Sequence, residues 1–189
     1  SQSAIMPLSH RHPMDRMFEP KRLRSMMAAD TMDPRSDGIH GMSKCQVYGN
    51  KQLFAAAYPA ESGRGDHIDE TLKSFIHDYG APDSMIMDGA KSQTQKGSAF
   101  VSRLRRNRIQ PIISNPFRPN MNPSEMVLRE LRKRWFRVIF KTNCPRALWS
   151  YGLPHFAELM QYTATYAAGL NGQTPIGHLL GIHQTSLNI

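Results

Sequence analysis

The chain has 189 residues, of which 40% are hydrophobic, and this length and composition suit one α/β domain with a sizeable apolar core. Lys and Arg number 24 against 15 Asp and Glu, so the formal net charge is +9 and we expect a polyanionic partner, with nucleic acid ranked above a membrane surface. The sequence has no apolar run of about 18 residues, no signal peptide and no lipidation motif, which argues against a membrane protein and predicts a soluble one.

The few residues that could bind zinc or form disulfides give no such site. Cys45 and Cys144 are the only cysteines and form no CxxC motif, which predicts a reduced intracellular compartment. His10 and His12 lack further ligands at metal-binding spacing, so we assign them to a polar tail.

The chain is predicted to consist of an arm and one folded domain. Residues 1–24 are rich in His, Arg, Met and Pro without periodicity, which indicates a basic arm or linker. Residues 25–185 carry the patterns of a single domain. Because the chain begins with Ser1 and stops without a distinct terminal segment, we expect it to be a piece of a longer protein.

The first half of the domain predicts three strands followed by a helix. The strands are expected at residues 25–32, 39–48 and 53–58. Gly49-Asn50 is a turn pair between the last two strands, because it permits positive φ. Apolar residues recur at helical spacing from Ile68 to Tyr79, which predicts a helix with Asp66 as its N-cap.

The second half alternates strands and helices. Further strands are expected at residues 84–87 and 109–113, and helices at 98–107, from Pro123 through about Phe140 with Asn122 as N-cap, and from Pro145 past Met160. Pro111 makes its strand an edge strand or an irregular one, and Pro154 should kink or divide the last helix. This order predicts a five-stranded mixed sheet flanked by helices.

Three acidic residues are candidates for a metal site. Asp30 and Asp88 each end an apolar strand, and Glu125 lies in the first turn of a predicted helix. Carboxylates that converge repel one another unless a cation neutralises them. Hard oxygen ligands select Mg²⁺ or Mn²⁺, so the trio would form a two-metal site for phosphoryl transfer.

Each acid also has an ordinary structural explanation. Either aspartate could instead be an ordinary residue at the end of a strand or in a turn. Glu125 completes a capping box with Asn122 and could pair with Arg129 one helical turn later. Asp33 and Asp37 are rivals for the first aspartate, although they fall in or beside a loop.

The helix that contains Glu125 is predicted to be amphipathic. Its apolar arc comprises Leu128, Leu131, Trp135, Val138 and Ile139, and its basic arc comprises Arg129, Arg132, Lys133 and Arg137. Glu125 lies on the basic side, which suits a DNA backbone lying across the site, although a solvated outer face would look the same. The second basic run, Arg103 to Arg108, would contact the DNA backbone or cover a surface helix.

Several segments together resemble one family. They are residues 29–32, 85–94, 116–125, 145–149 and 172–175, with Gly181. These segments resemble the catalytic core of retroelement integrases of the copia type, especially those of algal elements, within the retroviral integrase and transposase superfamily. The resemblance covers about residues 25–185, and the segments around Asp88 and Glu125 are its most specific part. Met121 and Pro123-Ser124 depart from the family pattern.

The resemblance implies a ribonuclease H-like fold and metal-dependent 3′-end processing and strand transfer of retroelement DNA. Asp30, Asp88 and Glu125 would then be the catalytic residues and the ligands of Mg²⁺ or Mn²⁺. Lys91 and the basic arc of the helix would bind DNA.

The resemblance also implies a homo-oligomer that acts on element ends and target DNA in the nucleus or in a virus-like particle. Two alternatives share the fold: a ribonuclease H-type nuclease that only hydrolyses, and a catalytically inactive nucleic-acid-binding module from a decayed element.

Overall fold

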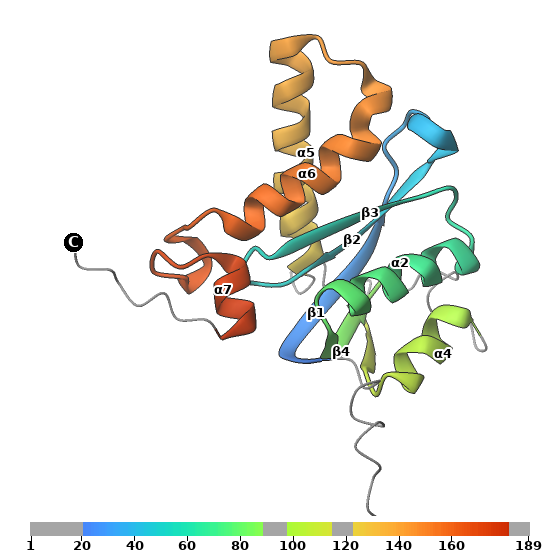
Figure 1. Cartoon of the computed structure of the whole chain (residues 1–189), viewed down its shortest axis with the longest axis vertical. Coiled ribbons are helices and arrows are strands. Elements are labelled where there is room, and N and C mark those ends of the chain that lie inside the picture. The colour runs from blue at the N-terminus through green and yellow to red at the C-terminus, as the bar shows by residue number, and fades with distance from the viewer. Residues whose placement is uncertain (1–20, 89–97, 115–122, 182–189) are drawn as a thin grey trace, which may run out of the picture.

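A five-stranded sheet forms the centre of the computed structural model, which describes residues 21–88, 98–114 and 123–181 (Figure 1). The strands are β1 (Arg22–Met32), β2 (Lys44–Gly49), β3 (Ala55–Ala60), β4 (Ala81–Met87) and β5 (Gln110–Ile113). Their order is β3-β2-β1-β4-β5, with antiparallel pairing among the first three and parallel pairing of β4 to β1 and of β5 to β4. The predicted mixed sheet is confirmed, and β5 with Pro111 lies at its edge.

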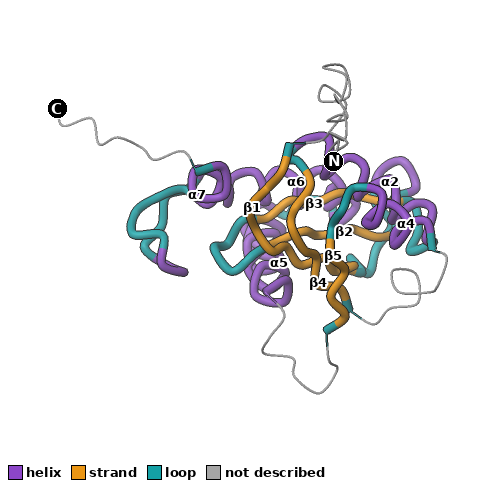
Figure 2. Tube along the Cα trace, turned by 90° about the horizontal axis from the view of Figure 1, so that it is seen from below, coloured by secondary structure: helices purple, strands orange, loops and turns teal. Residues whose placement is uncertain are grey.

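Helices cover both faces of the sheet, as Figure 2 shows. They are α2 (Gly65–Asp78), α4 (Ala99–Arg106), α5 (Pro123–Thr142), α6 (Trp149–Tyr162) and α7 (Pro175–Leu180), with short 3-10 turns at Ile39–Gly41, Arg146–Leu148 and Ala167–Gly169. One apolar cluster joins α2, α4 and α7 to the sheet, and a second joins α5 and α6 to the opposite face. None of the described helices is both long and apolar enough to cross a membrane.

The turn after β2 works differently from its prediction. Neither Gly49 nor Asn50 has a positive φ; the left-handed residue is Leu53, with φ 61°. The buried Asn50 side chain instead accepts hydrogen bonds from the backbone N–H groups of Gln52 (3.0 Å) and Phe54 (3.1 Å). Gly49 is required for packing, because a Cβ there would lie 2.8 Å from Cγ2 of Val127 on α5.

Element boundaries differ from the predicted ones in several places. β1 begins at Arg22, inside the stretch expected to be an arm, and the rest of that arm, with His10 and His12, lies outside the described residues. β2 begins only at Lys44, because His40 adopts a left-handed conformation (φ 62°) within the preceding 3-10 turn. Asp66 lies in the first turn of α2, so its assignment as N-cap is wrong: Arg64 holds that position.

The C-terminal helices also differ from the predicted ones. α6 continues through Pro154 and is not divided there, and it begins at Trp149 after a 3-10 turn. Asn122, expected to cap α5, lies outside the described residues. α7 has no counterpart among the predicted elements, although Thr174 caps its N-terminus by accepting from the N–H of Gly177 (3.2 Å) and Pro175 occupies its first turn.

Candidate active site

Asp30 and Asp88 leave neighbouring parallel strands at the same level of the sheet. Ala29 of β1 pairs with Met87 of β4, and each aspartate follows its paired residue directly. Ala29 and Met87 both belong to the apolar cluster beneath α2. Because successive side chains of a strand point to opposite faces, alternation directs both aspartates towards the face that α5 covers.

Glu125 reaches this region from α5. It lies in the exposed first turn of the helix, and Val127 and Leu128 behind it are buried against the sheet. The helix therefore brings an acidic first turn to the same face of the sheet as the two strand ends.

The pKa of Asp30 depends on the charges of the other two acids. Burial raises the pKa of the Asp30 carboxyl above its ordinary value, and the negative charges of Asp88 and Glu125 raise it further. The backbone N–H of Thr31 donates to Asp30 Oδ1 (2.7 Å) and opposes this rise, as does the positive charge of Arg132. A raised carboxyl pKa means that the ionised form is held at a free-energy cost, which a bound cation would offset.

A metal ion suits this donor set in its chemistry. Three carboxylates offer hard oxygen ligands of the kind that Mg²⁺ and Mn²⁺ prefer. Among the described residues, no group of three or more His, Cys, Asp or Glu side chains is close enough to hold a metal ion in this arrangement. Residues 89–97, which follow Asp88, and 115–122, which precede α5, lie outside the described part of the chain. The assignment of Asp30, Asp88 and Glu125 as ligands therefore stays a prediction.

The rival acids are engaged elsewhere or exposed. Asp33 Oδ2 accepts from Lys44 Nζ (2.6 Å), its Oδ1 accepts from the N–H of Arg35 (2.8 Å), and both bonds lower the Asp33 pKa. Asp37 is exposed in the loop. Asp33 thus has a cationic partner of its own, whereas the pKa of Asp30 responds to two further carboxylates.

The predicted amphipathic character of α5 is confirmed. Leu128, Leu131 and Trp135 are buried, and Val138 and Ile139 pack partly buried beside them. The predicted basic arc, Arg129, Arg132, Lys133 and Arg137, is exposed. Whether these residues bind DNA stays a prediction, and Lys91 lies outside the described residues.

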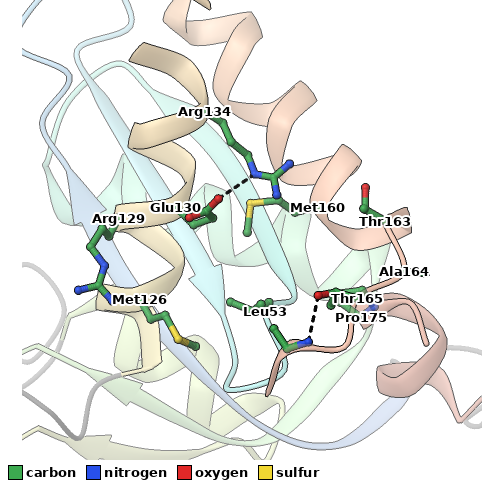
Figure 3. A pocket seen from close by; sticks show the side chains of 11 residues that line it. Leu53, Met126, Arg129, Glu130, Arg134, Met160, Thr163, Ala164, Thr165 and Pro175 are labelled. Atoms are coloured by element: carbon green, nitrogen blue, oxygen red, sulfur yellow. Dashed lines mark hydrogen bonds and ion pairs between the residues drawn. The ribbon is translucent and has the colours of Figure 1, made fainter. Parts of the chain in front are cut away.

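The anticipated ion pair between Glu125 and Arg129 is not among the ion pairs of the described residues. Arg134 instead pairs with Glu130, with 3.4 Å between Nε and Oε1 (Figure 3). This pair borders a hollow of about 400 Å³ on one side of α5, which Arg129 also lines. The described residues thus do not support the pairing with Arg129, and the alternative capping box with Asn122 lies outside them.

The second basic run divides into one structural arginine and several exposed ones. Arg103 on α4 donates from Nε and from one terminal nitrogen to the two carboxylate oxygens of Asp69 on α2. Asp69 is 7% exposed, so this bidentate pair is largely buried. Arg105, Arg106 and Arg108 are exposed. Arg103 therefore joins two helices, and only its neighbours are free to meet a ligand.

Sequence reasoning missed a pocket on the other side of α5. Its volume is about 460 Å³, and residues 32–36 after β1, the middle of α5 and the 3-10 turn before α6 contribute to its walls, together with Leu153 of α6. We call it the Arg132 pocket after the α5 arginine that lines it. Because its walls come from separate segments, no single stretch of sequence carried a signal for it.

No family model and no curated protein matches the chain at the level of sequence. In structure it is similar to the catalytic core domain of BIV integrase, with a TM-score of 0.61 and 14% identity over 82% of this chain and 93% of that one. It is also similar to a chain of the simian T-cell lymphotropic virus intasome in complex with PP2A regulatory subunit B56 gamma, with a TM-score of 0.66 and 13% identity. That match covers 90% of this chain and 60% of the intasome chain. The chain therefore has the ribonuclease H-like fold of integrase catalytic cores.

Proposed function

We propose that this chain is the catalytic core of a retroelement integrase of the copia type, similar to those of algal elements. It carries out metal-dependent 3′-end processing and strand transfer of element DNA. The observation that supports this most is geometric: Asp30 and Asp88 follow paired residues of neighbouring parallel strands in an integrase-type fold. The charges of Asp88 and Glu125, which both raise the pKa of Asp30, agree with it.

Asp30, Asp88 and Glu125 would hold Mg²⁺ or Mn²⁺ in this proposal. When bound, the cations would stabilise negative charge on the attacking and leaving oxygens of a phosphodiester. A water molecule or a DNA 3′-hydroxyl attacks phosphorus in line and loses its proton to solvent. The new P–O bond forms as the bond to the leaving 3′-oxygen breaks, that oxygen takes up a proton from solvent, and no covalent enzyme intermediate is required.

The chain's own residues position the reacting groups. The Thr31 N–H bond fixes one oxygen of Asp30, and the Thr31 hydroxyl donates to Gln46 Oε1 (2.6 Å) on β2, which anchors this end of β1 to its neighbour. The exposed arginines and lysine of α5, together with Lys91, bind DNA phosphates and hold the strand over the acids. The formal charge of +9 favours this partner.

Organisation and location are part of the proposal. Residues 25–185 form the catalytic core, and residues 1–24 form a basic arm or linker. The protein acts as a homo-oligomer on element ends and target DNA, in the nucleus or in a virus-like particle. The resemblance of the sequence segments and the fold shared with an intasome chain support this assignment.

A joining assay tests the proposal. The substrate is a labelled branched DNA that mimics the product of strand transfer, so that reversal of joining can be measured in Mn²⁺ without knowledge of the element ends. We expect the parent and the control Asp37→Asn to resolve the branch and Asp88→Asn to lose this activity. Equal product from the parent and Asp88→Asn would exclude Asp88 as a ligand.

Two parallel substrates separate the alternatives. Cleavage of a labelled RNA–DNA hybrid without any joining would favour the ribonuclease H-type nuclease. Salt-dependent DNA binding without cleavage of either substrate in Mn²⁺ would favour the inactive module.

A further inference from the structure

Three arginines line the Arg132 pocket. Arg35, Arg132 and Arg146 approach it from the loop after β1, from α5 and from the 3-10 turn before α6. Its one acid, Asp33, is paired with Lys44. None of the three arginines takes part in an ion pair with a carboxylate in the described part of the chain. Three arginines that line one pocket without a direct ion pair suit an anion, and guanidinium geometry matches phosphate particularly well.

Aromatic side chains lie beside this charge. Trp135 is 8% exposed and contributes to the pocket wall, whereas Phe136 lines the pocket and is 50% exposed. Met32, Ile139 and Leu153 complete the apolar part of the lining. An aromatic surface next to guanidinium groups suits a ligand that carries both a flat ring and a phosphate, as a nucleotide does.

The pocket wall is held in place before any ligand binds. The indole N–H of Trp149 donates to the backbone oxygen of Ser36 (2.8 Å), and Asp33 accepts from the N–H of Arg35 (2.8 Å). The second bond supports Arg35 in a left-handed conformation, with φ 59°. A wall that is already ordered costs little conformational entropy on binding, which favours a specific ligand site over an adaptable surface.

The position of the pocket connects it to the candidate active site. Its lining begins at Met32, two residues after Asp30 on the same strand, and it includes Arg132, whose charge acts on Asp30. Its volume of about 460 Å³ suits a small ligand and not a double helix. A base can enter such a pocket only when it is unpaired and unstacked.

We infer that the Arg132 pocket binds one unpaired nucleotide of the DNA strand that crosses the acidic site, with its base against Phe136 and its phosphate among Arg35, Arg132 and Arg146. This inference rests on the proposed function only for the identity of the polymer. It deepens that proposal by giving the enzyme a preference for DNA with a single-stranded overhang over blunt DNA.

Binding without catalysis tests the inference. Fluorescence anisotropy in EDTA compares two labelled duplexes of the same sequence, one blunt and one with a short single-stranded overhang. We expect the parent to prefer the overhang by about 10-fold, which is the effect of one stacked base. Phe136→Ala and Arg146→Gln should each reduce this preference, through the base and through the phosphate respectively.

The chain offers matched controls on the same helix. Phe140, 85% exposed one turn after Phe136, and Lys141 do not line the pocket. Phe140→Ala and Lys141→Gln should keep the preference. Because Phe136 and Arg146 are exposed, we expect both test variants to fold, and thermal unfolding checks this.

Three results would overturn the inference. They are equal affinity of the parent for both duplexes, equal effects of Phe136→Ala and Phe140→Ala, and competition by a glutamate-rich peptide as effective as that of an overhang of equal charge. The last result would assign the pocket to an acidic protein segment. A parent that prefers the overhang but fails the joining assay would retain the pocket inference while losing the proposed function.

Discussion

The positive charge of Arg132, on the second turn of α5 after Glu125, lowers the pKa of Asp30 at the end of β1, where burial and two carboxylates raise it. Arg132, on the basic face of α5, and Asp30 therefore lie close enough for their charges to interact. In an integrase core the same arrangement would attract phosphates and cations to adjoining positions. The raised pKa of Asp30 should also affect the stability of the protein.

Asp30→Asn should stabilise the metal-free protein at neutral pH. A carboxyl with a raised pKa holds its proton more tightly in the folded chain, so stability is lost as the pH rises through the unfolded and then the folded pKa. The neutral amide avoids this loss. We expect a higher Tm in EDTA at pH 7 and a flatter dependence of Tm on pH in the acidic range, measured by calorimetry. Asp37→Asn, at an exposed position, is the control, and a lower Tm for Asp30→Asn would contradict the argument.

Mg²⁺ should stabilise the parent and act more weakly on variants of the three acids. A ligand that binds only the folded state adds about 1.4 kcal/mol at ten times its dissociation constant. We expect the Tm of the parent to rise with Mg²⁺ concentration, and the rise to be reduced in Asp88→Asn and Glu125→Gln. An equal rise in the parent and both variants would place the cation elsewhere.

Arg103→Gln should destabilise the fold by about 3 kcal/mol, because it leaves the largely buried Asp69 carboxylate without its bidentate partner. Arg105→Gln, at an exposed position on the same helix, should change the free energy of unfolding by less than about 0.5 kcal/mol. Urea denaturation measures both. Similar changes in the free energy of unfolding for the two variants would show that the Arg103–Asp69 pair does not stabilise the fold.

The contrast between these two arginines shows how far the sequence could lead. The strand before Asp88 was predictable as a short apolar run, and the amphipathic α5 was predictable from its helical periodicity. The role of Arg103 was not, since its partner Asp69 lies 34 residues away on another helix. The Arg132 pocket was hidden for the same reason, as its arginines come from three separate segments.

The short helix α7 was missed for a different reason. α7 has only 6 residues, too few for apolar periodicity to stand out, and only its Thr174-Pro175 start and Gly181 stop could have revealed it.

The N-cap of α2 was misassigned because an acidic residue lies near the start of the helix. Asp66 lies two residues after the true cap, where its charge suits the positive end of the helix without capping it.

Gly152→Ala should destabilise the packing of α6 on α5, although alanine is the better helix former. A Cβ at this position would overlap the six-membered ring of Trp135, which is itself packed in the core and cannot withdraw as a flexible side chain could. We expect a loss of about 1 to 3 kcal/mol in unfolding free energy, as for other overpacked sites. Gly63→Ala is the control, because a Cβ there meets only Lys44 Cγ at 3.9 Å. Trp135 also lines the Arg132 pocket, so Gly152→Ala should weaken the overhang preference as well. An unchanged Tm would contradict the stability prediction and show that α6 can shift to make room for the added Cβ.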